Sequence, residues 1–239
     1  ADAATGRVLW PYKPVDAFST FATLSAQMGS AIGESTSMIE EETTGRVMEF
    51  MLRFASLVPA FCETSNPFEI SERLVSADDY DYAAPLYGYT NYSREGFRGR
   101  VLAYDDVPSF DGRATGSQLG GAGIAVSAHS AHPELAAKIA VFLSSAEAQR
   151  GPYTERHGQP GNLRAWLSPR MNDITHGFFR NTLRSIEGAW VRPRLVGWPN
   201  FQFGMSQIIH RALVRGDYLA SDWMTMERHR DELVERAGE

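Results

Sequence analysis

The stretch "GGAGIAVSAHSAHPELAAKIAVFLSSAEAQRG", residues 120–151, joins a short apolar segment to a long helical pattern. The segment "GIAVSA" (123–128) has the length and composition of a β-strand. The following residues, 129–149, predict a helix entered through Pro133, with Glu134 favourably placed at the positive end of the helix dipole. A strand followed by a helix is the repeating unit of α/β proteins, so this stretch indicates an α/β fold.

The predicted helix is amphipathic. Its apolar residues recur at steps of three and four positions, which predicts that one helix face is buried against the rest of the protein. The residues on that face are Leu135, Ile139, Phe142, Leu143 and Ala146.

The rest of the chain repeats this alternation of short apolar segments and helical patterns, without an internal repeat. A further apolar segment leads into residues 85–93. Predicted strands cover residues 7–12 and 100–108, and predicted helices cover residues 16–29, 47–58, 201–216 and 220–237.

Composition limits the possible functions. The 239 residues are 43% hydrophobic and 22% charged, which is ordinary for a globular protein with a real core. No apolar run approaches the roughly 18 to 20 residues that cross a bilayer. The opening residues "ADAATGR" have neither a basic nor an apolar signal region, so no signal peptide is expected in this chain.

Charge and cysteine content narrow the choice further. The net charge of −6 disfavours nucleic acid as a partner, because binding to its phosphates needs clustered cations. The only lysines are Lys13 and Lys138. Cys62 is the single cysteine, so it forms no intrachain disulfide and is expected to be packed in the core.

Three motifs that resemble chemical sites have simpler interpretations. The stretch "GSQLGGAG" (116–123) lacks the Lys-Ser/Thr of a P-loop and precedes a strand, which favours a connector. His129 and His132 precede a helix without a nearby acidic or cysteine ligand, so no metal site is expected. Acidic pairs such as Asp78 and Asp79 occur in loops, where carboxylates are usually solvated. We therefore assign no catalytic residue and expect no cofactor.

The stretch "PLYGYTNYS" (85–93) places three tyrosines and an asparagine where a strand runs into a loop. Three interpretations remain open: a platform that stacks on a ring, a partner interface, or an amphipathic edge strand. Sugars and similar solutes are held by aromatic faces, while amides, carboxylates and arginines bond their hydroxyl groups.

Residues of these types gather in loops at the ends of predicted strands, where α/β sheets bind their ligands. By themselves they indicate a ligand-binding α/β protein. The candidate ligand-binding residues are Trp10, Tyr12, Tyr87, Tyr89, Asn91, Gln118, Gln159, Asn162, Trp190, Arg192 and Arg194.

Residues 120–151 resemble the extracellular solute-binding proteins of family 1, the receptors of ABC importers for sugars and related solutes. The segments "GQPGNLRAWLSP" and "GAWVRPRLVGWPNFQFGMSQIIHRALVRGD" resemble later regions of that family, and the likeness extends from about Arg7 to Val234. The residues that match the strand and helix motif of the family are 120–127, Ser130, Pro133, Glu134, Phe142, Leu143, Ser145, Glu147 and Gln149.

The resemblance implies a periplasmic-binding-protein-like (type II) lobe, with a mixed sheet flanked by helices. In the family, two such lobes close on a ligand. The resemblance makes residues 1–105 the first part of the second lobe and residues 106–151 a strand and helix returning to the first lobe. Residues 152–239 are then the helical end of the second lobe, and the opening part of the first lobe is absent.

The resemblance also implies a function. It predicts a monomeric receptor, periplasmic or extracellular, that binds a carbohydrate-like or other polar solute without turnover and delivers it to the membrane permease of an ABC importer. Because sugar-binding family members carry stacking rings at the matching turn, Tyr87 and Tyr89 are the expected platform, followed by Asn91. Arg192 and Arg194 are expected either to bind an acidic group of the ligand or to form structural ion pairs.

A second class of function stays open. The chain could be a glycoside-active enzyme, or a degenerate lobe that serves as an interaction module.

Overall fold

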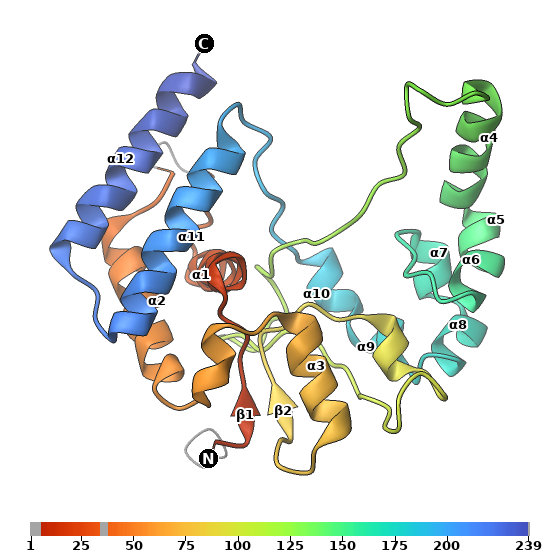
Figure 1. Cartoon of the computed structure of the whole chain (residues 1–239), viewed down its shortest axis with the longest axis horizontal. Coiled ribbons are helices and arrows are strands. Elements are labelled where there is room, and N and C mark those ends of the chain that lie inside the picture. The colour runs from red at the N-terminus through yellow and green to blue at the C-terminus, as the bar shows by residue number, and fades with distance from the viewer. Residues whose placement is uncertain (1–5, 34–37, 239) are drawn as a thin grey trace. The chain divides into compact units, whose positions relative to one another are not determined.

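The computed structural model describes residues 6–33 and 38–238 (Figure 1). The chain forms two compact units. Unit 1 comprises Ala1–Tyr87, Val107–Leu119 and Arg184–Glu239, and unit 2 comprises Gly88–Asp106 and Gly120–Leu183. The assignment of sequence ranges to parts of two receptor lobes stays a prediction. The expectation about a signal peptide rests on the opening residues, most of which lie outside the described residues.

Unit 1 contains a small parallel sheet. Strand β1 (Val8–Leu9) pairs with β2 (Tyr82–Ala83), with Val8 opposite Tyr82 and Leu9 opposite Ala83. Strand β1 lies inside the predicted strand 7–12, which is confirmed at Val8 and Leu9 only. This two-stranded parallel sheet is the only sheet in the described part of the chain, so the mixed sheet implied by the family resemblance is not formed by the described residues.

Helices make up most of unit 1, and each helix predicted for it is present. Helix α2 begins before the predicted range because its first turns are polar, and the apolar pattern marks only the part that is buried. The helices are α1 (Pro14–Gln27), α2 (Glu41–Ala55), η2 (Ala60–Glu63), α3 (Pro67–Ser76), α10 (Leu183–Glu187, which begins at the border of the unit), α11 (Trp198–Arg215) and α12 (Ala220–Ala237).

Local signals in the sequence place the helix ends. Pro14 is the first residue of α1, where its missing N–H costs nothing, and Asp16 lies in the first turn. Helix α3 begins with a capping box: Asn66 Oδ1 accepts from the Glu69 backbone N at 3.0 Å, and Glu69 Oε2 accepts from the Asn66 backbone N at 2.7 Å.

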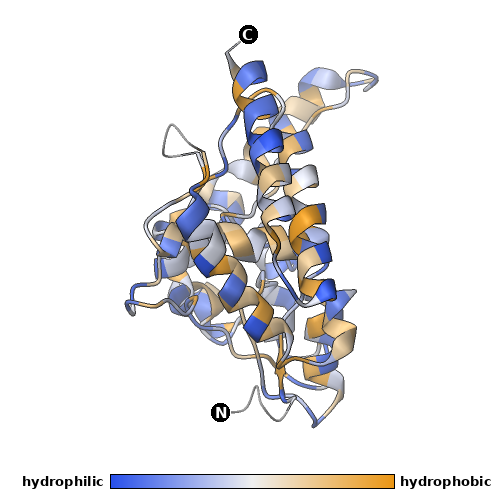
Figure 2. Ribbon diagram, turned by 90° about the vertical axis from the view of Figure 1, so that its left-hand side faces the viewer, coloured by the Kyte–Doolittle hydropathy of each residue, from blue (hydrophilic) through white to orange (hydrophobic). Residues whose placement is uncertain are grey.

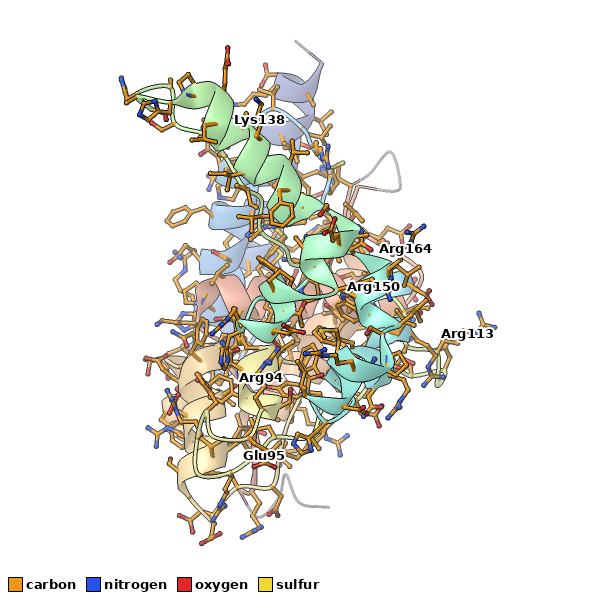
Figure 3. All side chains as sticks on the ribbon, turned by 90° about the vertical axis from the view of Figure 1, so that its right-hand side faces the viewer. Arg94, Glu95, Arg113, Lys138, Arg150 and Arg164 are labelled. Carbon is orange, nitrogen blue, oxygen red and sulfur yellow. The ribbon has the colours of Figure 1, made fainter. Side chains whose placement is uncertain are left out.

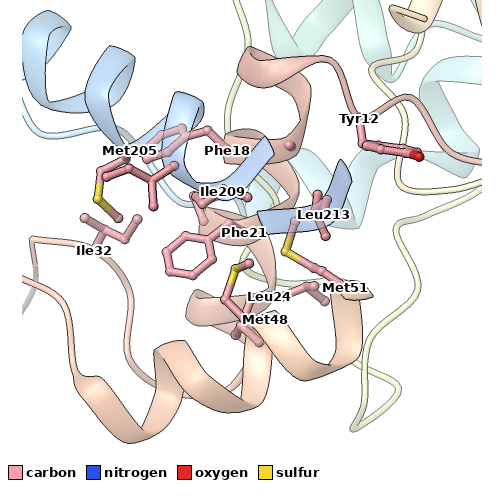
Figure 4. Packing of buried hydrophobic residues seen from close by; sticks show 14 of the residues in the cluster. Tyr12, Phe18, Phe21, Leu24, Ile32, Met48, Met51, Met205, Ile209 and Leu213 are labelled. Atoms are coloured by element: carbon pink, nitrogen blue, oxygen red, sulfur yellow. The ribbon is translucent and has the colours of Figure 1, made fainter. Parts of the chain in front are cut away.

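The core of unit 1 lies where α1 packs against α2 and α11 (Figure 4). Cys62 is fully buried next to this core, as predicted. Hydrophobic and hydrophilic residues alternate along α12, which covers α11 on its other side (Figure 2). The largest fully buried side chains of the unit are Trp10, Phe18, Phe21, Leu9, Ile32, Met48, Met51, Ile70, Met205 and Ile208.

A pair of glycine substitutions tests this packing. A Cβ added at Gly204 in α11 would lie 2.6 Å from the ring of His229 in α12, so we expect Gly204→Ala to lower the free energy of unfolding by about 1 to 3 kcal/mol. Gly45 in α2 has open space around it, so Gly45→Ala should raise that energy by about 0.5 to 1 kcal/mol. Urea titrations of both variants measure the difference, and equal effects would contradict the described α11–α12 packing.

Unit 2 is built from short helices around a smaller core. Trp166, Met171, Phe178 and Phe179 form this core, with the ring of Tyr104 edge-on to Phe178 at 4.7 Å. The helices are η3 (Thr90–Ser93), α4 (Pro133–Ser144), α5 (Ala146–Gln149), α6 (Pro152–Glu155), α7 (Leu163–Trp166), α8 (Pro169–Asp173) and α9 (Phe178–Asn181).

Two predicted strands are wrong. Residues 100–108 and 123–128 form no strand, because neither range belongs to a β-ladder of the described residues. In the first range a backbone hydrogen bond, from the Leu102 N to the Tyr92 carbonyl at 2.8 Å, reaches another segment. Residues 85–93 are not an edge strand either, since they belong to no strand and end in η3.

The predicted burial of one face of α4 is also wrong. The helix begins at Pro133 as predicted, but none of its residues is buried. Leu135, Ile139 and Phe142 are exposed, and Leu143 is only half-buried. The sequence pattern requires an apolar neighbour for this face, and the described residues provide none.

Within the described residues, no helix has both the length and the apolar character needed to span a membrane.

Candidate functional site

One face of α1 carries polar residues that are buried. Asp16, Ser19, Thr20 and Thr23 recur at three- and four-residue steps, and each is at most 9% exposed. The indole Nε1 of Trp10 donates to Thr20 Oγ1 at 2.9 Å. A helix that faced water here would carry long charged side chains, so the small hydroxyl residues indicate close packing on this face.

Gln118 packs against this polar face. Its backbone N donates to Thr23 Oγ1 at 3.1 Å, and its side-chain Nε2 donates to the phenol oxygen of Tyr87 at 2.8 Å. Gln118 also forms a parallel bridge with Trp190, flanked by a bond from the Leu119 N to the Trp190 carbonyl at 2.9 Å. The stretch predicted as a connector is therefore held in place over its first half.

We call Asp16, Ser19, Tyr87, Gln118 and Arg192 the Tyr87 cluster. All five belong to unit 1. The Tyr87 phenol has Ser19 and Gln118 as hydrogen-bonding neighbours, and the charges of Arg192 and Asp16 both act on it.

Two acceptor atoms of the Tyr87 cluster are unsatisfied. Asp16 Oδ2 and Gln118 Oε1 are buried, and neither has a hydrogen-bond partner among the described residues. The two side chains belong to residues that are 8% and 7% exposed. A buried acceptor without a donor costs about 1 to 3 kcal/mol, more when it is charged, so each of these two oxygens is a cost to the folded state that a hydrogen-bond donor would remove.

Burial also perturbs the ionisation of the cluster. The pKa of the Asp16 carboxyl is raised to about 6, chiefly because the carboxyl is buried. The positive charge of Lys13 lowers this pKa, and the negative charge of Glu69 raises it. Burial likewise raises the pKa of the Tyr87 phenol, so this phenol stays protonated and able to donate at neutral pH. Strongly perturbed acids gather at functional sites because function, and not stability, requires the burial of their charge.

The shifted pKa of Asp16 makes stability depend on pH. Because the pKa is higher in the folded state than the ordinary 3.8, this carboxyl opposes folding once it is ionised, and the penalty grows as pH rises from 3.8 through about 6. Asp16→Asn removes this titration. We expect the variant to gain on the order of 2 kcal/mol relative to the natural protein between pH 4.5 and 8. Urea unfolding of both proteins at pH 4.5 and 8 measures this gain. If the difference in free energy of unfolding between the two proteins is the same at both pH values, the raised pKa is contradicted.

Other predicted ligand-binding residues of unit 1 are structural. Trp10 is fully buried, with its ring stacked between Tyr12 at 4.9 Å and Phe54 at 5.1 Å. Tyr12 is 5% exposed and tilts against the ring of His210. Neither ring presents a free face to a solute in this arrangement.

The segment after α10 contributes Trp190 and two arginines. Trp190 is buried, with its ring 6.1 Å from that of Trp198. Arg192 is exposed, and its Nη1 donates to Gln202 Oε1 at 3.4 Å. Arg194 is exposed as well. The positive charge of Arg192 lowers the pKa of the Tyr87 phenol, so Arg192 is counted in the Tyr87 cluster.

The remaining candidates lie in unit 2. Gln159 holds the Tyr89 loop: its Oε1 accepts from the Thr90 N at 3.0 Å, and its Nε2 donates to the Gly88 carbonyl at 3.2 Å. Asn162 caps α7 by accepting from the Arg164 N at 3.0 Å. Both side chains therefore position the backbone.

Tyr89 is half-buried, and Asn91 has a buried Oδ1 that lacks a hydrogen-bond partner in the described part of the chain. Tyr87 belongs to unit 1 and Tyr89 to unit 2, so the predicted double-ring platform is divided between the units. A role for Tyr89 and Asn91 in ligand binding stays a prediction.

The sequence contains a signal for the site residues that were not predicted, Asp16 and Ser19. From Pro14 to Gln27 the only charged residue is Asp16, and the face opposite the phenylalanines holds Ser and Thr. When the face opposite the apolar one lacks lysine and glutamate, the helix is expected to be buried on both faces.

The described residues contain no group of three or more histidine, cysteine or acidic side chains able to hold a metal ion. His132 precedes α4 as its N-terminal flanking residue, in agreement with its interpretation as a helix-entry residue.

Comparison with known proteins places the fold among the solute-binding proteins. The structure is similar to that of the maltose-bound MalE3 of T. maritima, with a TM-score of 0.79 and 16% sequence identity. The match covers 97% of this chain and 62% of that chain, so this chain spans less than two thirds of the matched structure. At this identity the likeness shows the fold alone. No protein-family model and no curated protein matches the sequence.

Proposed function

We propose that this chain is a solute receptor of an ABC importer, and that the Tyr87 cluster binds the solute. The solute is carbohydrate-like or another small polar molecule, bound without turnover and passed to a membrane permease in the periplasm or outside the cell. The solute-binding fold supports the class of protein. The family resemblance of residues 120–151 supports the importer.

One observation carries the choice of site. Asp16 Oδ2 and Gln118 Oε1 are two buried acceptors without donors in the described part of unit 1, beside a phenol that can donate. A solute hydroxyl is both donor and acceptor, so a pair of hydroxyls satisfies the two oxygens and accepts from Tyr87. Burying such acceptors for no ligand would only cost stability.

The charges of the cluster favour a neutral solute. Asp16 is ionised above a pH of about 6, and its negative charge would repel an acidic group nearby. Arg192 is the exposed member of the cluster, and its charge is positive. A solute with an acidic group could therefore place that group near Arg192 and away from Asp16. Sugars and polyols meet these requirements most simply.

A panel of sugars, polyols and sugar phosphates tests the proposal by its effect on melting temperature at pH 7.5. A ligand at 100 times its Kd stabilises the folded state by about 2.7 kcal/mol, so the melting temperature should rise by several degrees with at least one neutral member. Mass spectrometry of the recovered solute should show it unchanged.

The alternatives predict other outcomes. A glycoside-active enzyme would release smaller products from the same incubation. A degenerate lobe would leave the melting temperature unchanged with every member, and this result would refute solute binding by the Tyr87 cluster.

A further inference from the structure

Arg94 is a buried cation of unit 2 (labelled in Figure 3). It directly follows η3 and is only 6% exposed. Arginine is almost never fully buried unless its charge is paired. Burial lowers the pKa of the Arg94 guanidinium, and no acidic side chain in the described part of the chain opposes this effect. The charge is therefore buried without an acidic partner among the described residues.

The guanidinium lies between η3 and α6 and is only partly hydrogen-bonded. Its Nη2 donates to the Thr154 carbonyl at 2.6 Å, and Thr154 is fully buried in α6. Its Nε is buried too, and this atom has no hydrogen-bond partner among the residues that the structure describes. Because a carbonyl oxygen carries only a partial negative charge, the bond to Thr154 does not neutralise Arg94.

The acidic residue that follows each partner of this bond binds another side chain. Glu95 Oε1 lies 3.2 Å from His176 Nε2, and Glu155 Oε1 lies 2.7 Å from Arg170 Nη2. A guanidinium does not lose its proton in proteins, so Arg94 cannot avoid the cost of burial by becoming neutral. A buried charge without its partner strongly destabilises the folded state. The surroundings of Arg94 therefore lack a negative charge.

The same turn holds a second buried atom without a hydrogen-bond partner in the described part of the chain, the Oδ1 of Asn91. The backbone N of Arg94 donates to the Asn91 carbonyl at 3.1 Å. Because η3 is a 3-10 helix, side chains three positions apart lie on the same side of it. Arg94 Nε requires an acceptor and Asn91 Oδ1 requires a donor. A group that both accepts and donates would satisfy the two atoms together.

We propose that Arg94 and Asn91 bind a small oxyanion that carries a hydroxyl group, of the chemical class of hydrogenphosphate. A charged oxygen of the anion accepts from Arg94 Nε, and the hydroxyl of the anion donates to Asn91 Oδ1. A guanidinium matches phosphate in geometry, and such charge-assisted hydrogen bonds are about twice as strong as neutral ones. A water molecule would satisfy the same two atoms but would leave the positive charge without a counterion. The proposal is independent of solute binding by the Tyr87 cluster, which belongs to unit 1.

Melting temperatures in matched salts test the proposal. Residues 1–239 are heated at pH 7.5 in about 20 mM sodium phosphate or sodium sulfate, with the ionic strength kept constant by sodium chloride. Sulfate is the matched control because it has the oxygens of phosphate and no hydroxyl group at this pH. Phosphate should raise the melting temperature by about 3 °C or more relative to chloride alone, and sulfate should raise it less. Equilibrium dialysis should find about one phosphate bound per chain.

Two variants assign the effect to Arg94. Arg94→Met removes the charge and keeps a long unbranched side chain, so the response to phosphate should vanish. Arg164→Met removes an exposed charge of the same unit, also labelled in Figure 3, so the response should remain. The proposal is overturned if phosphate gives no rise over chloride, if sulfate gives an equal rise, or if the rise survives in Arg94→Met.

A measurement on the natural protein decides the question if Arg94→Met does not fold. The Nε–H resonance of Arg94 is assigned through the carbon resonances of its own side chain and followed during titration with phosphate. Binding should shift this resonance in a saturable way, because the anion accepts the hydrogen bond from Nε. A resonance that responds equally to phosphate and chloride would overturn the proposal.

Discussion

Phe18→Ala is expected to lower the free energy of unfolding of unit 1 by about 4 kcal/mol. The Phe18 ring is fully buried in α1 and lies edge-on to Trp198 and to Phe201 of α11, with ring centroids 6.5 Å apart in each pair. Truncation removes the buried ring and leaves a cavity between the two helices that form the centre of the core. The rigid surroundings can collapse only in part, so the transfer and cavity terms add.

The matched control is Val15→Ala, one turn earlier on the same helix. Val15 is exposed, so this substitution should change the free energy of unfolding by less than about 0.5 kcal/mol. Urea titrations followed by circular dichroism and by tryptophan fluorescence measure both variants. A loss below about 1.5 kcal/mol for Phe18→Ala would mean that α1 and α11 are not packed as described.

Gln118→Leu is expected to weaken binding of the stabilising solute by about 30- to 100-fold. The substitution removes one unsatisfied acceptor and the donor that holds the Tyr87 phenol, which together are worth roughly 2 to 3 kcal/mol in a buried site. Leucine has a similar size and leaves the backbone bonds of residue 118 to Thr23 in place. The loss should therefore come from the missing polar contacts and not from unfolding.

Calorimetric titration measures the dissociation constant. Asn200→Ala, on an exposed position of α11 outside the Tyr87 cluster, should bind as the natural protein does. If Gln118→Leu melts normally and binds the solute with unchanged affinity, the solute lies elsewhere on the protein.

The helices of unit 1 could be predicted from the sequence because their signals are local. Pro14 at the first turn of α1 and the apolar pattern of α2 each act within one helix, so neither requires knowledge of distant residues. The strands could not be predicted equally well. A strand forms only if another segment offers a paired edge. Residues 100–108 and 123–128 have the right composition, but neither joins a sheet among the residues that the structure describes.

The candidate site was predictable in part. Tyr87, Gln118 and Arg192 follow from the rule that aromatic and planar polar residues at loop ends bind polar solutes. The rule failed to separate these residues from Trp10 and Gln159, because the same residue types pack in cores and hold loops. Asp16 was missed because a single acid in a helical first turn is most simply interpreted as favourable to the helix dipole.

The most direct test of solute binding at the Tyr87 cluster is the pKa of Asp16 with and without solute, followed by the carboxyl carbon resonance in a pH titration. The resonance is assigned by its loss in Asp16→Asn. Without solute the pKa should be about 6. Saturation with the stabilising solute should lower it by about one unit or more, because hydroxyl donors favour the charged carboxylate. A pKa unchanged at saturation would show that the solute does not reach Asp16 and would contradict the proposed site.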